Sequence, residues 1–179
     1  SFLYSLLVRQ FTPYVDTHFQ NLSKLFFVLK AVIKRHLPRF HLKMIKEGID
    51  LGIIFASWCL TLFTQVEQYF ENSRILDQII DLFVADNWAG FFRVIILILG
   101  SCEEQLLLMS TEDLLLFLSE IAKTNFKEIF KDHSKINIKT MMLRYMDIDS
   151  DFVEQEINEY HQVIKNTEDF WSGLKEKLQ

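Results

Sequence analysis

The sequence predicts an all-α protein, and three observations lead to that prediction. Apolar residues recur at helical spacing along almost the whole chain. Of the 179 residues only 5 are glycine and 2 are proline, which is too few turn-forming residues for a fold of many hairpins. Hydrophobic residues make up 50% of the chain, so the helices must enclose a large core. We therefore expect a multi-helix bundle that ends in a long C-terminal helix.

Proline and glycine divide the first third of the chain into four expected helices. The first covers residues 2–9, and the second follows Pro13 with apolar residues on one side and lysines on the other. Pro38 ends this helix, and the next one stops at Gly48, a typical C-cap residue. Residues 51–63 then form a fourth helix, which is apolar enough to be buried.

The stretch "ILDQIIDLFVADNWAGFFRVIILIL" (residues 75–99) predicts two consecutive helices. The first is amphipathic, with Asn72 or Ser73 as its cap, and "DNW" is the joint to the second. The second, residues 88–99, is apolar almost all round, so other helices of the protein must cover it. This run is too short for a bilayer, which needs about 20 residues, and no transmembrane segment is predicted.

Arg93 is the single charge inside this apolar helix. A guanidinium in such a place must be paired with an acid or reach the solvent. Asp81 and Asp86, in the preceding helix and the joint, are the candidate partners. We expect Arg93 to clamp the two helices together, which is a structural role and not a catalytic one.

The C-terminal part of the chain is expected to hold short helices followed by one long helix. Ser110 and Asp113 resemble a capping box that opens a helix, and the more polar residues after Lys123 suggest two short helices. The last helix begins near Ser150. Its apolar residues follow a heptad rhythm at Val153, Ile157, Tyr160, Ile164, Trp171, Leu174 and Leu178. We expect this seam to dock onto the same chain, with a partner helix as the alternative.

No metal site, cofactor site or catalytic site is predicted. Asp147, Asp149 and Asp151 have the spacing of a calcium loop, but Phe152 and Asn158 stand where that loop needs glycine and glutamate. These acids fit the N-terminus of a helix instead. No glycine-rich phosphate loop or nucleophile elbow occurs. The two cysteines lie in apolar helices without zinc-ligand spacing, which favours a reduced, cytoplasmic setting.

The net charge of −5 hides a basic stretch that lacks any acid between Asp16 and Glu47. Seven basic residues fall there: Lys24, Lys30, Lys34, Arg35, Arg39, Lys43 and Lys46. We expect them to be the solvated faces of two amphipathic helices. The alternative is a surface for an acidic partner or for peripheral contact with anionic lipid. We do not expect nucleic-acid binding, because the whole chain is acidic and no recognition motif occurs.

The same segments resemble the Rab-GAP TBC domain family. "FASWCLTLF" looks like the family's "FASRWFLTLF". Asp86-Asn87-Trp88 replaces the family's "EGW" joint, and Phe92-Arg93-Val94 matches the start of its "FRVALAIL". We take Trp58, Asp81, Trp88 and Arg93 as the signature residues, whereas Ile80 stands where the family commonly has tryptophan. The likeness runs collinearly from about Phe2 to Ile121.

This resemblance implies the C-terminal lobe of a TBC-like domain over residues 1–123 and a helical extension over residues 124–179. In the family, an arginine finger (IxxDxxR) and a glutamine finger (YxQ) of the N-terminal lobe stimulate GTP hydrolysis on a Rab-type GTPase. The resemblance places both motifs upstream of Ser1, so no catalytic residue is transferred onto this chain. The expected partners are the N-terminal lobe and the GTPase. Two alternatives are an inert TBC-like scaffold and an unrelated helical interaction module.

Overall fold

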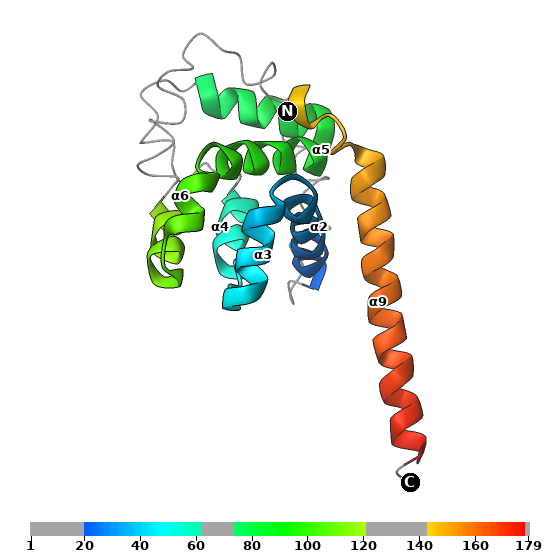
Figure 1. Cartoon of the computed structure of the whole chain (residues 1–179). Coiled ribbons are helices and arrows are strands. Elements are labelled where there is room, and N and C mark those ends of the chain that lie inside the picture. The colour runs from blue at the N-terminus through cyan, green and yellow to red at the C-terminus, as the bar shows by residue number, and fades with distance from the viewer. Residues whose placement is uncertain (1–19, 62–73, 121–142, 178–179) are drawn as a thin grey trace.

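A computed structural model describes residues 20–61, 74–120 and 143–177, and within these ranges it contains helices and no strand (Figure 1). The helices, in chain order, are α2 (Gln20–His36), α3 (Pro38–Glu47), α4 (Gly52–Thr61), α5 (Arg74–Ser101) and α6 (Glu103–Leu108). Three more helical elements follow: a helix over residues 111–120, the 3-10 helix η3 (Leu143–Tyr145) and α9 (Ser150–Lys177). The all-α prediction is confirmed, and α9 begins at the expected residue.

Some predictions concern residues outside the described ranges. These are the first helix over residues 2–9, the caps Asn72 and Ser73, most of the polar region after Lys123, and the boundary at residue 123. The short helix α6 was not predicted, because its six residues offer too little periodicity to separate it from its neighbours.

Three predicted helix ends are confirmed by their local geometry. Gly48 is left-handed with a φ of 64°, and the Ile49 N–H donates to the Met44 carbonyl oxygen at 2.9 Å. The Asp113 N–H donates to the Ser110 hydroxyl at 3.2 Å, and that hydroxyl donates to the Asp113 carboxylate. At the start of α9, the Phe152 N–H donates to the Asp149 carboxylate at 2.8 Å.

Helix α5 bends at the predicted joint. Asn87 has a φ of 54° and a ψ of −139°, so two helical halves meet there instead of one straight rod. Taken end to end, residues Leu76–Ser101 are long and apolar enough to cross a membrane, which corrects the expectation from the shorter run. However, 78% of the most apolar window is buried inside the protein, as in the core helix of a bundle.

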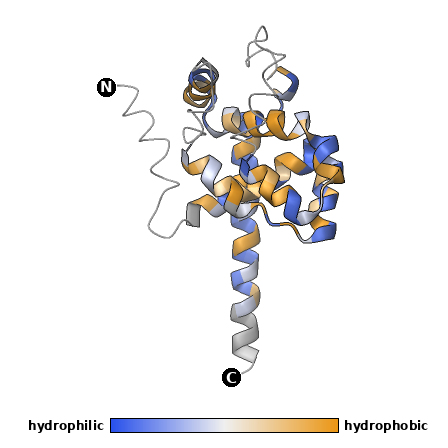
Figure 2. Ribbon diagram, turned by 90° about the vertical axis from the view of Figure 1, so that its left-hand side faces the viewer, coloured by the Kyte–Doolittle hydropathy of each residue, from blue (hydrophilic) through white to orange (hydrophobic). Residues whose placement is uncertain are grey.

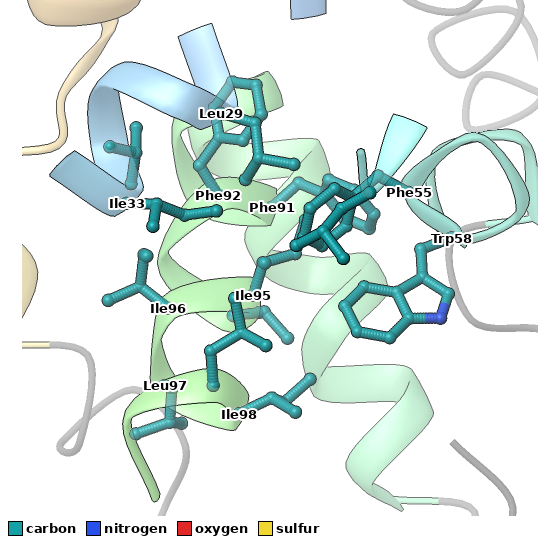
Figure 3. Close-up of a cluster of buried hydrophobic side chains, with 14 of the residues drawn as sticks. Leu29, Ile33, Phe55, Trp58, Phe91, Phe92, Ile95, Ile96, Leu97 and Ile98 are labelled. Carbon is teal, nitrogen blue, oxygen red and sulfur yellow. The ribbon is translucent and has the colours of Figure 1, made fainter. Parts of the chain in front are cut away.

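The second half of α5 is the centre of the hydrophobic core. Every residue from 88 to 99 is buried, and neighbouring helices supply the cover that the sequence demands. Figure 3 shows Leu29 and Ile33 of α2 and Phe55 and Trp58 of α4 gathered around this part of α5. The Trp58 side chain is 1% exposed and meets the Phe55 ring edge-on, with 5.2 Å between the ring centroids.

Helix α9 packs on the lobe mainly with its first half. It contacts α2 and α5 through residues such as Val153, and the Tyr160 ring meets Phe27 of α2 edge-on at 5.6 Å. Beyond this point Ile164 and Glu168 still share a groove with Lys24 of α2, and the end of α9 then extends away from the helical body (Figures 1 and 2). Residues 161–171 are all exposed, so the expected docking of the seam onto the same chain holds for its first half, only in part for Ile164, and not for Trp171.

Candidate functional site

Three of the predicted signature residues lie on α5, one before its kink and two after it. Trp88 follows the kink directly, is 3% exposed, and meets the rings of Phe83 and Phe91 edge-on at 5.2 and 5.6 Å. Arg93 lies further along the same half of α5 and is buried. Asp81 is exposed on the half before the kink. Trp58 lies apart from them in α4. The placement of Trp58 and Trp88 in the core indicates a structural role for both.

Arg93 is the one buried charged residue within the described ranges, and it is paired as expected. Its Nη1 donates to the Asp86 carboxylate at 2.7 Å, which selects Asp86 from the two candidates and makes the Asp81 alternative wrong. Its Nε donates to the backbone carbonyl of Ile148 at 2.7 Å. Arg93 therefore joins the kink to the segment that precedes α9, and not merely the two halves of α5.

The Ile148 carbonyl was missed because a backbone acceptor has no signature in the sequence. The sequence marks the neighbouring Asp147 only as one of three spaced acids. Its carboxylate accepts from the Arg35 Nε at 2.9 Å, and the Arg35 guanidinium also lies over the Phe152 ring, 5.1 Å from its centroid. The segment before α9 is thus attached to both α2 and α5.

His36 lies at the junction where the segment before α9 meets α2. Its ring meets Tyr145 edge-on at 5.3 Å, and its Nε2 is 3.4 Å from the Asp147 carboxylate, close enough for attraction but without a hydrogen bond. Burial lowers the pKa of His36 below its usual value, and the nearby Arg35 cation lowers it further. The Asp147 carboxylate opposes both effects by favouring the protonated ring.

The junction is therefore expected to lose stability on acidification. Because the folded state lowers the pKa of His36, the unfolded chain binds more protons as the pH falls through about 6.5, so the free energy of unfolding decreases there. Urea titrations between pH 7.5 and 5.5 measure this slope. His36→Phe keeps a ring beside Tyr145 and should flatten the slope, whereas Asp147→Asn should steepen it. A slope that His36→Phe leaves unchanged would contradict the assignment.

The space beside the kink is small and holds no catalytic constellation. A cavity of about 210 Å³ lies between the kink and the start of α9, with Asp86, Asn87 and Trp88 on one side and Val153 and Glu154 on the other. Within the described residues, no group of histidine, cysteine and acidic side chains could hold a metal ion. Burial raises the pKa of the Cys59 and Cys102 thiols to about 12, so neither is a ready nucleophile.

The arginines whose side chains are described are all engaged within the chain. Arg93 bridges Asp86 and Ile148, Arg35 binds Asp147, Arg39 pairs with Glu104, and Arg144 lies over the Tyr145 ring. An arginine finger must reach out of its own protein to a bound nucleotide. Arg93, which is buried and held at two sides, is not arranged in that way.

One triplet with the letters YxQ does occur, at Tyr160, His161 and Gln162. It lies on α9, and Gln162 is exposed there. In the family the glutamine motif belongs to the N-terminal lobe, whereas α9 is the last described helix of this chain. The triplet in α9 therefore receives no catalytic role.

Part of the predicted basic surface faces acids of the same chain. Lys30, Lys34 and Arg35 of α2 line one wall of a groove of about 500 Å³, and Glu156 and Glu159 of α9 line the other. Burial raises the pKa of Glu156, as does the neighbouring Glu159, while Lys34 and Arg35 oppose this shift. Helix α9 is thus an acidic neighbour for the basic face of α2.

Comparison with known proteins gives two findings. The model of the Rab-GTPase-TBC domain family matches residues 1–107. A TBC domain-containing protein of Schizosaccharomyces pombe is 29% identical over 101 residues, which are 56% of this chain and 13% of that protein. The chain thus spans about 13% of the length of this relative. Helices α2 to α5 lie inside the family match, whereas α9 lies beyond it.

Proposed function

The chain belongs to the Rab-GTPase-TBC domain family, and on that premise we propose that it is the C-terminal lobe of a regulator that stimulates GTP hydrolysis by a Rab-type GTPase. The observation that carries the proposal is the family match over residues 1–107, which coincides with a helical lobe built around the buried second half of α5. In this proposal the finger residues belong to an N-terminal lobe upstream of Ser1.

The different roles proposed for the two lobes follow from the chemistry of phosphoryl transfer. An arginine finger neutralises the charge that develops on the phosphates, and a glutamine orients the attacking water. The buried Arg93 is held by Asp86 and by the Ile148 carbonyl, which supports a structural role for this half. The lobe would hold the other half in place and add to the surface that meets the GTPase.

A catalytically inert scaffold is the second candidate. Two observations favour it: Ile80 occupies the place where the family commonly has tryptophan, and an exposed apolar stripe follows on α9, outside the family match. Both are compatible with a member of the family that binds partners without accelerating hydrolysis.

The residues encoded upstream of Ser1 and a hydrolysis assay distinguish the two candidates. We expect the parent protein to carry IxxDxxR and YxQ upstream, and to accelerate single-turnover GTP hydrolysis on at least one member of a Rab panel by about 10³-fold or more. Lysine in place of the finger arginine should abolish the acceleration, and the present chain alone should leave hydrolysis at the intrinsic rate. A parent protein that binds a GTP-loaded Rab without accelerating hydrolysis would favour the scaffold instead.

A further inference from the structure

Helix α9 lies along α2 in antiparallel orientation, as Figure 1 shows. Side chains of the two helices meet at three levels, whose order along α9 is the reverse of their order along α2. From the end of α2 to its start, the neighbours are Arg35 with Phe152, Phe27 with Tyr160, and Lys24 with Glu168. Helix α9 therefore covers the outer face of α2 over most of its length.

The two helices carry opposite charges on the sides that face each other. Lys30 and Lys34 line one wall of the groove of about 500 Å³, and Glu156 and Glu159 line the other. Nearer the start of α2, Lys24 and Glu168 share a second groove of about 490 Å³. The acids of α9 that reach the grooves thus lie beside bases of α2.

These charges attract one another across a gap. Among the residues that the structure describes, no ion pair joins Lys30 or Lys34 to either Glu156 or Glu159. Attraction between separated charges near the surface is weak, and salt screens it over about 8 Å at physiological ionic strength. Electrostatic attraction therefore draws α9 toward α2 without fixing it there.

The firm polar attachments lie just before α9. The Arg93 Nε donates to the Ile148 carbonyl, and the Arg35 Nε donates to the Asp147 carboxylate. Residues 150–172 contain neither proline nor glycine, so we expect α9 to move as one rod about this anchored segment. Moving it away would expose the buried Val153 and part the rings of Tyr160 and Phe27, so the closed arrangement prevails until a ligand compensates for that cost.

We propose that α9 is an autoinhibitory cover over a binding surface of α2 formed by Lys24, Phe27, Lys30 and Lys34. When α9 swings away, this surface binds an acidic amphipathic helix of a partner protein. Helix α9 itself shows the chemistry that fits, since its acids lie beside the lysines and its Tyr160 ring meets Phe27. The family match ends before α9, so the cover is an addition to the matched lobe.

A partner helix fits this surface better than an anionic membrane does. Helices that bind at a membrane surface insert a broad apolar face into the lipid. The broad apolar face of α2, with Leu25 and Leu29, is buried in the core of the lobe. Among the lysines of the covered side only Phe27 and Ala31 are apolar, which suits one ring of a partner helix but leaves little to insert into lipid.

Hydrogen exchange tests the opening of α9. Raising NaCl from about 0.05 to 0.5 M should accelerate exchange at residues 154–171 about threefold or more, and leave residues 88–99 of α5 unchanged. Glu156→Gln with Glu159→Gln should give the same acceleration at low salt. Asp77→Asn with Glu112→Gln removes the same charge from exposed positions elsewhere and should not. Exchange in α9 that ignores both salt and the two glutamates would overturn the proposal.

A fluorescent peptide with the sequence of residues 150–177 is the probe for the covered surface. The wild-type chain should bind it weakly, because its own α9 competes at an effective concentration of about 1 mM. Glu156→Gln with Glu159→Gln should bind the peptide about tenfold more tightly, since the cover is weakened and the peptide keeps its acids. Adding Lys30→Gln and Lys34→Gln should remove this gain. Circular dichroism should be equal for all of these proteins.

The same variants identify the occupant. A peptide with glutamine at positions 156, 159 and 168 should not bind the opened chain. An opened chain that ignores the acidic peptide, or that binds it equally well without Lys30 and Lys34, would overturn the proposal. Binding to phosphatidylserine vesicles in place of the peptide would show a membrane surface and would refute a partner helix.

Discussion

Replacing Gly90 with alanine is expected to destabilise the protein by about 3 kcal/mol, at the upper end of the range for overpacking a core. Because α5 bends at Asn87, the Leu82 carbonyl oxygen comes to lie directly over Gly90. A Cβ atom at residue 90 would lie 2.7 Å from that oxygen. The clash is with backbone, so no side-chain rotation can relieve it. The usual preference of a helix for alanine over glycine, about 1 kcal/mol, offsets only part of the cost.

Urea unfolding of Gly90→Ala and Gly100→Ala measures the difference. Gly100 lies in the same half of α5, but a Cβ there would first meet the Tyr145 hydroxyl at 3.3 Å, the far end of a side chain. We expect Gly100→Ala to change the free energy of unfolding by about 1 kcal/mol or less, since the tyrosine can shift. Equal effects at the two glycines would show that the kink does not bring Leu82 and Gly90 together.

Arg93→Met is expected to cost about 3 kcal/mol, because it breaks two buried contacts at once. The Ile148 carbonyl would lose its charged donor inside the protein. Asp86 would lose its ion-pair partner, although its side chain is 41% exposed and can recover part of the loss by hydration. The variant should also loosen the start of α9, so amide exchange should accelerate at residues 149–160 more than in α3.

A double-mutant cycle assigns the partner of Arg93. Arg93→Met and Asp86→Asn should be coupled by about 1 kcal/mol or more, because the two groups share one ion pair. Asp81→Asn is the matched control, an exposed acid before the kink whose effect should add to that of Arg93→Met. Coupling to Asp81 in place of Asp86 would be incompatible with the geometry.

The ends of the helices could be predicted from the sequence because short contacts decide them. Gly48, the Ser110–Asp113 pair and Asp149 each act within about four residues of the helix end that they define. Burial of the second half of α5 was also predictable, since a helix that is apolar all round has no stable place in water. The joint at residues 86–88 is visible for a related reason, because polar residues interrupt two apolar periods there.

The partners of Arg93 and the cover of α9 were decided only by the tertiary structure, because they depend on segments that are distant in sequence. From the sequence, both Asp81 and Asp86 are possible ion-pair partners of Arg93. The bend at Asn87 brings Asp86 to it. The second partner, the Ile148 carbonyl, lies 55 residues away and is a backbone atom that any residue would supply. Likewise, apolar residues follow heptad spacing in both halves of α9, but the lobe covers the first half and leaves Ile164 and Trp171 exposed. Periodicity shows which face of a helix needs cover, whereas the position of the other helices determines how much of that face receives it.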